Sequence, residues 1–225
     1  MKQQLIDYTI ASEHDCMNLG QSSLYARWGK TLFDIALGLM LLPVLLPVIA
    51  ILCAVVALDG GLPIFGHKRI GKSGREFRCW KIRTMVVDAQ ERLQDHLADN
   101  PKAAAEWELN FKLENDPRIT RVGRFLRKSS LDELPQLFNV FCGQMSFVGP
   151  RPIVRDELRR YGLPQHLYMS MRPGVTGLWQ VSGRNDVAYD QRVAMDVQYA
   201  RNVSLTEDVR IVAKTATSVI GLTGK

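Results

Sequence analysis

The sequence predicts an α+β fold that is mostly helical, with a re-entrant (helix-break-helix) membrane segment and a compact domain containing a β-hairpin. A run of 24 uncharged residues from Ile35 to Leu58 predicts the membrane segment, and two β-rich stretches around a glycine-containing turn predict the hairpin. Helical periodicity runs through most of the remainder. At 225 residues, 46% of them apolar, the chain can bury one core besides a membrane element. We therefore expect a mobile leader (1–22), a membrane-associated segment (23–60) and one further domain (61–225).

Composition narrows the classes of partner. A formal charge of +6 suits anionic partners, which are nucleic acid, acidic lipid headgroups or phosphorylated small molecules. The apolar run favours membrane and phosphate over nucleic acid. The cysteines are far apart and show no paired spacing, which predicts neither a disulfide framework nor a zinc site: they are Cys16, Cys53, Cys79 and Cys142.

The apolar run is long enough to cross a bilayer, because 24 residues of straight helix reach ~36 Å. It begins more than thirty residues into the chain and is followed by Asp59-Gly60-Gly61 rather than a small-x-small cleavage site. A cleaved signal peptide is therefore not expected.

Two features favour a re-entrant hairpin over a simple crossing. Pro43 and Pro47 each remove a backbone donor near the centre of the run, where lipid offers no replacement. Basic residues lie on both sides of it, and the positive-inside tendency would hold both flanks in the cytoplasm. These residues are Arg27 and Lys30 before the run, and Lys68, Arg69, Lys72 and Arg75 after it. A proline-kinked spanning helix is the alternative.

The remaining elements follow in order. Ile64–Ile70 and Arg75–Arg83 are rich in β-branched and aromatic residues and predict the hairpin, with Gly71-Lys72-Ser73-Gly74 as its turn. Helical patterns cover Met85–Leu97 and Lys102–Leu113, and short helices are expected around 120–128 and 135–142.

A capping box, Ser204-Leu205-Thr206-Glu207, opens a final helix. Its apolar face, which we expect to pack on the core or to lie on the membrane surface, consists of Leu205, Val209, Val212, Ala216 and Val219.

The string from Gly66 to Ser73 fits the P-loop pattern G-x-x-x-x-G-K-[ST] letter for letter. A real P-loop opens a helix whose first amides hold phosphate, whereas Gly74 and the strand-like run from Arg75 follow here. We therefore interpret this string as a basic hairpin turn and expect no nucleoside triphosphate site.

The candidate chemistry lies between residues 116 and 137. Arg118, Arg121 and Arg124 recur at three-residue intervals and predict a solvated basic face, or one resting on acidic lipid. Arg127 lies closer to the adjacent pair Asp132-Glu133, which precedes a proline suited to a first helical turn.

Two readings of this acidic pair remain open. Near the positive end of a helix, an ionised carboxylate can attack a phosphoryl centre beside a divalent cation, with its neighbour as helper. Alternatively, Ser130 and Glu133 form a capping box and Asp132 only complements the helix dipole.

Two later loops hold arginines between rigid or small residues. In Gly149-Pro150-Arg151-Pro152 the prolines fix the backbone around one arginine, an arrangement that suits phosphate binding. The stretch Arg172–Asn185, which includes Trp179 and Arg184, either cradles a nucleotide or is a packed loop with Trp179 in the core.

In these residues the chain resembles the bacterial sugar transferases, also called monotopic polyprenyl-phosphate phosphoglycosyl transferases, of the kind that start exopolysaccharide repeat units. The resemblance extends from about Arg27 to the C-terminus. The motifs that carry it are Lys81-Ile82-Arg83-Thr84-Met85, Leu131-Asp132-Glu133-Leu134-Pro135-Gln136, Gly149-Pro150-Arg151-Pro152 and Arg172-Pro173-Gly174-Val175-Thr176-Gly177.

The resemblance implies that Asp132 attacks the sugar-linked phosphate of a UDP-sugar, that UMP leaves, and that undecaprenyl phosphate then takes the phosphosugar, a hexose such as galactose or glucose. It further implies Mg²⁺ at Asp132 and Glu133. Phosphate or nucleotide contacts would come from Lys81, Arg83, Arg127, Arg151 and Arg184.

The resemblance also implies a place for the chain, the bacterial inner membrane, with 61–225 as a cytoplasmic catalytic domain. The family commonly has serine before the membrane proline, whereas this chain has Leu42-Pro43 and Leu46-Pro47. The short leader implies that the extra membrane domain of larger relatives is absent. Expected partners are the UDP-sugar, the polyprenyl phosphate and inner-membrane lipid, without nucleic acid; a homo-oligomer is possible. The alternative function is a non-catalytic membrane adaptor for polysaccharide assembly.

Overall fold

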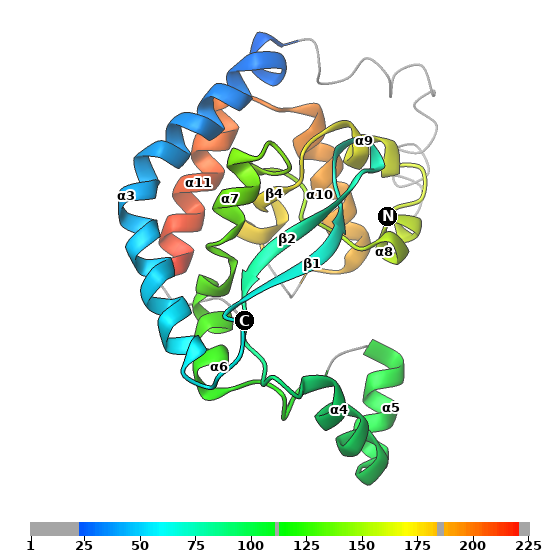
Figure 1. Cartoon of the computed structure of the whole chain (residues 1–225). Coiled ribbons are helices and arrows are strands. Elements are labelled where there is room, and N and C mark those ends of the chain that lie inside the picture. The colour runs from blue at the N-terminus through cyan, green and yellow to red at the C-terminus, as the bar shows by residue number, and fades with distance from the viewer. Residues whose placement is uncertain (1–22, 111–112, 184–186, 221–225) are drawn as a thin grey trace.

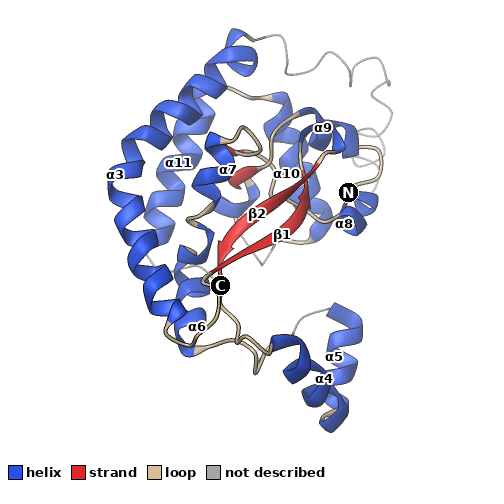
Figure 2. Ribbon diagram, in the orientation of Figure 1, coloured by secondary structure: helices blue, strands red, loops and turns tan. Residues whose placement is uncertain are grey.

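The computed structural model describes residues 23–110, 113–183 and 187–220. In this part of the chain helices surround two small sheets, and one long helix lies along one side of the domain (Figures 1 and 2). The expected α+β, mostly helical fold is confirmed. The expected leader, 1–22, lies outside the described residues.

The long helix is α3 (Lys30–Ala57), preceded by one π-helical turn, η1 (Tyr25–Gly29). It is long and apolar enough to cross a membrane. It continues through Pro43 and Pro47 without interruption, so the expected break is not seen and the re-entrant topology is not confirmed. Each proline removes only one donor, and the hydrogen bonds of the neighbouring turns carry the helix past the gap.

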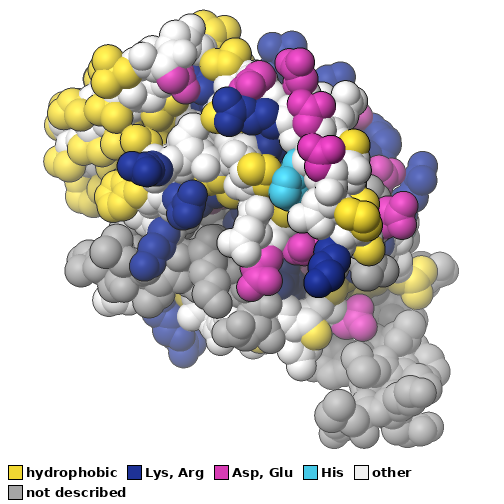
Figure 3. Space-filling view, turned by 90° about the horizontal axis from the view of Figure 1, so that it is seen from below, with side chains coloured by type: hydrophobic (Ala, Val, Ile, Leu, Met, Phe, Trp, Pro, Cys, Tyr) yellow, Lys and Arg dark blue, Asp and Glu magenta, His cyan; other side chains and the backbone are white. Residues whose placement is uncertain are grey.

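One face of α3 packs on the domain along the length of the helix. The residues buried on this face are Lys30, Asp34, Gly38, Ile49 and Val56. The opposite face carries exposed apolar side chains. In Figure 3 the apolar side chains gather on the side where α3 lies, whereas charged side chains are scattered over other parts of that view. The apolar residues exposed on α3 include Leu32, Leu39, Met40, Val44, Leu46, Ile51 and Val55. The helix therefore faces the domain on one side and presents an apolar surface on the other.

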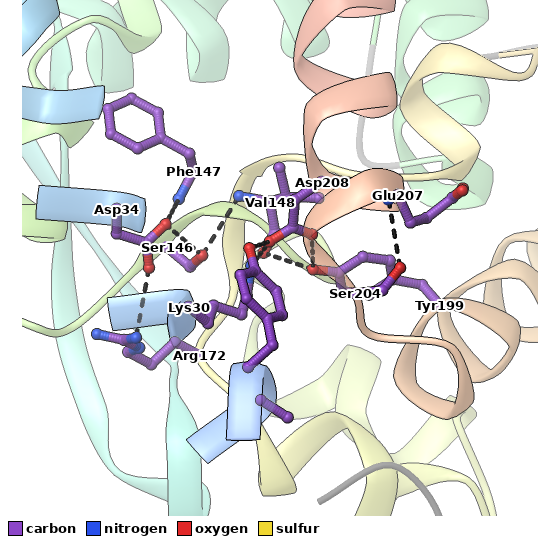
Figure 4. Close-up of polar contacts among 12 residues, drawn as sticks. Lys30, Asp34, Ser146, Phe147, Val148, Arg172, Tyr199, Ser204, Glu207 and Asp208 are labelled. Atoms are coloured by element: carbon purple, nitrogen blue, oxygen red, sulfur yellow. Dashed lines mark hydrogen bonds and ion pairs between the residues drawn. The ribbon is translucent and has the colours of Figure 1, made fainter. Parts of the chain in front are cut away.

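Buried charges fix the first turns of α3 to the domain (Figure 4). Lys30 Nζ lies 2.7 Å from Asp208 Oδ2, and the same oxygen accepts a hydrogen bond from the Tyr25 hydroxyl. The Tyr199 hydroxyl donates to the other oxygen, Asp208 Oδ1. Asp208 is fully buried, and these three donors compensate the cost of removing its charge from water.

A second buried acid, Asp34, lies on α3 itself, one turn after Lys30. Asp34 is 1% exposed, and its Oδ1 accepts hydrogen bonds from the Ser146 hydroxyl and the Phe147 amide. Its Oδ2 lies 3.3 Å from the guanidinium of Arg172 (Figure 4). Charges inside an otherwise apolar helix thus bind this end of α3 to two separate parts of the domain.

Arg83 holds the other end of α3. Its guanidinium donates to both carboxylate oxygens of Asp59 and to the carbonyl oxygen of Val56. Val56 also packs in a small core with Ile82 and Leu126. Both ends of α3 are therefore attached to the same domain.

The hairpin is confirmed. Strand β1 (Ile64–Ile70) pairs antiparallel with β2 (Glu76–Ile82), and Phe65 lies opposite Lys81. The turn, η2 (Lys72–Gly74), is short and has positive φ at Ser73 and Gly74. The P-loop-like string therefore lies in a strand and a tight turn, and no helix follows it, as expected.

After the hairpin come α4 (Ala89–Asp99), α5 (Pro101–Asn110) and α6 (Arg121–Ser129). Arg121 and Arg124 are exposed on α6, as expected of a solvated basic face. Arg118 is not: it is buried, with a bidentate ion pair to Asp116 and its guanidinium over the ring of Trp107. That prediction was wrong because an acid two residues earlier turns Arg118 inward.

The C-terminal half completes the core. It comprises 3-10 turn η3 (Leu131–Glu133), α7 (Gln136–Phe141), β3 (Ser146–Val148), α8 (Arg155–Arg160), α9 (Gln165–Ser170), β4 (Gly174–Thr176), 3-10 turn η4 (Trp179–Val181), α10 (Tyr189–Arg201) and α11 (Leu205–Ile220). Val148, Tyr199 and Ile211 form one cluster, whereas Ile70, Ile153, Tyr161 and Tyr168 form another.

The final helix begins where its capping residue predicts, and the Glu207 amide donates to the Ser204 hydroxyl. Its buried face differs from the expected one. Leu205 and Val209 are half-exposed, whereas Asp208 and Ile211 are buried. Among the described residues of the predicted face, Val212 packs against the core, whereas Leu205, Val209 and Ala216 do not. The alternative, that this face lies on the membrane surface, stays a prediction.

The buried carboxyl of Asp196 makes stability depend on pH. Asp196 is buried on α10, and the Tyr161 hydroxyl donates to its Oδ2 at 2.7 Å, while Oδ1 has no hydrogen-bond partner. Burial raises its pKa to about 7, although the bond from Tyr161 opposes this. The folded state therefore holds this proton more tightly than the unfolded state.

We predict that the native chain loses stability as pH rises from about 4 to 7. Asp196 contributes its full stabilisation below its pKa in the unfolded state, about 3.9, and this stabilisation is lost as pH rises through its folded-state pKa of about 7. The difference between the two pKa values corresponds to at most ~4 kcal/mol of unfolding free energy. Asp196→Asn should flatten this slope in thermal unfolding from pH 4 to 8. Equal slopes for the two proteins would contradict the assignment, and the exposed Asp156→Asn serves as the control.

Candidate active site

Asp132 and Glu133 lie together in η3, between α6 and α7. Ser130, in the left-handed region at φ 58°, ends α6 and turns the chain. The Ser130 side chain caps nothing here, and the Glu133 carboxylate bonds elsewhere. The capping-box reading of this pair is therefore wrong, and both carboxylates are available for another role.

Two cations hold Glu133. Its Oε1 accepts a hydrogen bond from Lys81 Nζ at 2.6 Å and one from the guanidinium of Arg151 at 3.3 Å. Burial alone would raise the pKa of Glu133, but Arg151 and Lys81 outweigh it and lower the pKa to about 2. Glu133 is thus ionised and fixed in place at any physiological pH.

Asp132 differs from its neighbour. It is buried, and its closest cation is Lys81, 3.9 Å from Oδ2; among the described residues none donates a hydrogen bond to its carboxylate. Burial raises the pKa of Asp132, and Lys81 only partly offsets this. The environment therefore separates the pKa values of two adjacent carboxyls, as in sites where two acids have different roles. A more basic carboxylate with free oxygens is the better nucleophile.

Asn139 connects the strand of Lys81 to the helix that follows the acidic pair. Fully buried on α7, it accepts from the Trp80 amide at 3.0 Å and donates to the Arg78 carbonyl at 2.8 Å. Asn139 was not among the site residues predicted from the sequence. The only sign of its role in the sequence is that a polar amide side chain stands among apolar residues of α7. The sequence does not show which strand this side chain would bond.

Close backbone packing positions Arg151. Strand β3 pairs parallel with β4, so the two glycine-proline motifs meet although they are more than twenty residues apart. A Cβ on Gly174 would lie 2.2 Å from the Gly149 nitrogen, and one on Gly177 would lie 2.4 Å from the Gly149 oxygen. Only glycine permits this approach. The loop of Arg151 therefore leaves a tightly packed parallel pair.

The other predicted contacts have different positions. Arg127 donates from Nε to the Thr84 hydroxyl and interacts electrostatically with Asp132. Arg83 bonds to Asp59 and Val56 at the end of α3 rather than to the acidic pair. Arg184 lies outside the described residues.

Within the described part of the Arg172–Asn185 loop, Trp179 is buried, with the guanidinium of Arg192 over its ring. Of the two alternatives predicted for this loop, the buried position of Trp179 agrees with a packed loop that has Trp179 in the core.

The acidic pair could supply carboxylate ligands to a divalent cation, but not a complete coordination shell. The described residues contain no cluster of three or more acidic, histidine or cysteine side chains suited to a complete metal cage. However, both oxygens of Asp132 and Oε2 of Glu133 accept no hydrogen bond from any described residue. Mg²⁺ characteristically uses one or two carboxylates and completes its shell with phosphate and water.

Comparison with known proteins identifies the relatives of this chain. The model of the bacterial sugar transferase family matches residues 25–221. The chain is 53% identical over 220 residues to the undecaprenyl-phosphate galactose phosphotransferase of Salmonella typhimurium, covering 95% of this chain and 46% of that protein. It is 50% identical over 213 residues to the UDP-galactose-lipid carrier transferase of Erwinia amylovora, covering 93% and 45%.

A shorter relative is aligned over most of its length. The exopolysaccharide production protein ExoY of Rhizobium meliloti is 49% identical over 191 residues, which is 84% of each chain. This chain thus spans a little under half of the two longer relatives and most of the shorter one.

We predict that Lys81→Met raises the pKa of Glu133 and destabilises the protein at neutral pH. The variant removes a 2.6 Å charged hydrogen bond, typically worth about 1.5–3 kcal/mol, which the native chain keeps until pH falls towards about 2. The deficit in melting temperature should narrow as pH falls below 4.

Arg78→Met is the matched control, because Arg78 lies on the same strand but faces away from the site. If both variants show the same melting temperature at pH 7, the ion pair does not contribute as described.

Proposed function

This chain belongs to the bacterial sugar transferase family, and on that premise we propose that it transfers a sugar 1-phosphate from a UDP-sugar to undecaprenyl phosphate, the first step in building an exopolysaccharide repeat unit. The observation that carries the proposal is the contrast inside the acidic pair. Glu133 is fixed by Lys81 and Arg151, whereas the neighbouring Asp132 accepts no hydrogen bond from any described residue at either carboxylate oxygen.

The reaction proceeds in two displacements. An oxygen of Asp132 attacks the phosphorus that carries the sugar, the bond from that phosphorus to the UMP oxygen breaks, and UMP leaves with the electron pair. A phosphoryl oxygen of undecaprenyl phosphate then attacks the same phosphorus. The bond to Asp132 breaks, which regenerates the carboxylate and gives undecaprenyl diphosphate sugar.

The chain's own residues stabilise these steps. Lys81 and Arg151 offer positive charge beside the phosphorus centre, and Arg127 adds to the field around Asp132. Asp132 and Glu133 Oε2 would hold Mg²⁺, which would neutralise phosphate oxygens that otherwise repel an attacking carboxylate. Arg184 is proposed as a nucleotide contact from its place in the motif. Arg83 is proposed to act indirectly, by fixing α3 beside the site.

The attachments of α3 support a monotopic placement, in which the helix does not cross the inner membrane and the domain lies on its cytoplasmic side. A helix that crossed a bilayer would leave its two ends on opposite sides of ~30 Å of hydrocarbon. Here Lys30 bonds to Asp208 and Asp59 bonds to Arg83, so both ends belong to one polar domain. The exposed apolar face of α3 then enters the membrane from the domain's side.

The sugar is proposed from the relatives alone. Two of them are named for galactose transfer, and galactose is therefore the first donor to test.

We predict that Asp132→Asn abolishes transfer of labelled sugar phosphate from UDP-galactose into undecaprenyl phosphate. Loss of the nucleophile should lower the rate at least roughly a thousand-fold, equivalent to ~4 kcal/mol of barrier. The measurement is lipid-extractable label from purified full-length protein in detergent with Mg²⁺. Asp156→Asn, an exposed carboxylate on α8, should transfer at the native rate.

Equal transfer by the native chain and Asp132→Asn would reject the mechanism. Absence of transfer from every UDP-sugar in a panel would favour a non-catalytic membrane adaptor instead.

We further predict that single cysteines at position 24 and at position 62, on either side of α3, react from the same side of the membrane. In a background without the native cysteines, Leu24→Cys and Leu62→Cys replace two highly exposed side chains. A membrane-impermeant maleimide should label both only after the inner membrane is permeabilised. Labelling of one position in intact spheroplasts would instead show that the helix crosses.

A further inference from the structure

Arg69, on β1, lies on the same face of the hairpin as Lys81. Side chains alternate along each strand, and the register pairs Phe65 with Lys81, His67 with Cys79 and Arg69 with Phe77. This face is therefore turned toward the acidic pair. The buried thiol of Cys79 interacts electrostatically with Arg69 as well as with the charged groups of the site, Lys81, Glu133 and Arg151.

The charge around Arg69 is unusual. The nearest acid is Glu157, 3.8 Å away, and the guanidinium makes no hydrogen bond to any described residue although only 23% of the side chain is exposed. Burial lowers the pKa of Arg69, and electrostatic repulsion by Arg151 lowers it further. A half-buried arginine beside a second arginine costs free energy unless an anion joins them.

A purely structural ion pair explains Arg69 poorly. Structural arginines of this chain make short bonds: Arg118 reaches Asp116 at 2.7 Å, and Arg83 donates to several oxygens of the α3 end. Glu157 is engaged in capping α8, where its Oε2 accepts from the Val154 amide. The Arg69 guanidinium has five N–H donors, none of which bonds a described residue, and it lies in the field of a second cation; this combination matches what a phosphate group requires.

We propose that Arg69 and Arg151 together form a phosphate subsite beside Asp132 and Glu133. Its ligand is a phosphate group, which two substrates of the proposed reaction carry: the diphosphate of the nucleotide sugar and the phosphate of the polyprenyl acceptor. Arg151 is 43% exposed and bonds Glu133 through one nitrogen, so part of its fork is free to share the anion. This inference rests on the proposed function only in naming these two sources.

The test compares Arg69→Gln and Arg69→Lys with Arg155→Gln, in purified full-length protein in detergent. Arg155 is an exposed arginine paired with Glu76 and serves as the matched control. Calorimetry measures UDP binding, and initial rates give KM separately for UDP-galactose and for undecaprenyl phosphate.

Arg69→Gln should weaken UDP binding, or raise KM for one substrate, by roughly 10- to 100-fold, because a charge-assisted bond is lost. Arg69→Lys should lie between it and the native chain, and Arg155→Gln should stay within twofold. A raised donor KM with weaker UDP binding identifies the diphosphate as the ligand, whereas a raised acceptor KM alone identifies the lipid phosphate.

Glu157→Gln separates this subsite from a structural ion pair. The subsite requires that removing Glu157 leaves UDP binding and both KM values unchanged or improved. The proposal is overturned if Glu157→Gln weakens UDP binding or raises a KM as much as Arg69→Gln does. It is also overturned if mutating Arg69 changes neither UDP binding nor either KM value. If the native chain transfers no sugar phosphate, the proposed function fails, but calorimetry of UDP and of undecaprenyl phosphate binding to the Arg69 variants still decides whether the subsite exists.

Discussion

The 2.6 Å ion pair between Lys81 and Glu133 is the interaction on which the site depends. It joins the hairpin to the turn before α7, and the same lysine lies 3.9 Å from Asp132. Burial raises the pKa of Asp132, whereas Arg151 and Lys81 lower the pKa of Glu133. Two adjacent carboxylates therefore have opposite pKa shifts, and one remains free to react.

The scaffold around that pair brings distant segments together with little freedom. Asn139 pins β2 to α7, and the glycines of β3 and β4 let two backbones approach so that the Arg151 loop leaves them at a fixed place. The membrane helix is part of the same scaffold. Its buried Lys30 and Asp34 have partners only in the folded domain, so the apolar helix and the polar domain fold as one unit.

Local patterns predicted much of this architecture. The hairpin, the short helices, the start of α11 and the acidic pair all follow from periodicity, turn residues and adjacency in the chain. Tertiary pairing decided the rest. Arg118 turned inward to Asp116, the face of α11 was set by Asp208 rather than by Leu205, and the two prolines did not interrupt α3. The partner of Asp208 lies far away in the sequence. The partner of Arg118 is only two residues away, but the sequence does not show that this pair is buried with the Arg118 guanidinium over the ring of Trp107.

In the proposed mechanism, Asp132 carries the phosphosugar as a covalent ester. Mass spectrometry of the full-length protein, incubated with UDP-galactose and Mg²⁺ but without lipid acceptor and quenched rapidly, tests it directly. We expect a hexose-phosphate mass increment on the peptide containing Asp132, and its disappearance when undecaprenyl phosphate is added before the quench. An unmodified peptide under conditions in which the same preparation transfers sugar phosphate to lipid would contradict the account.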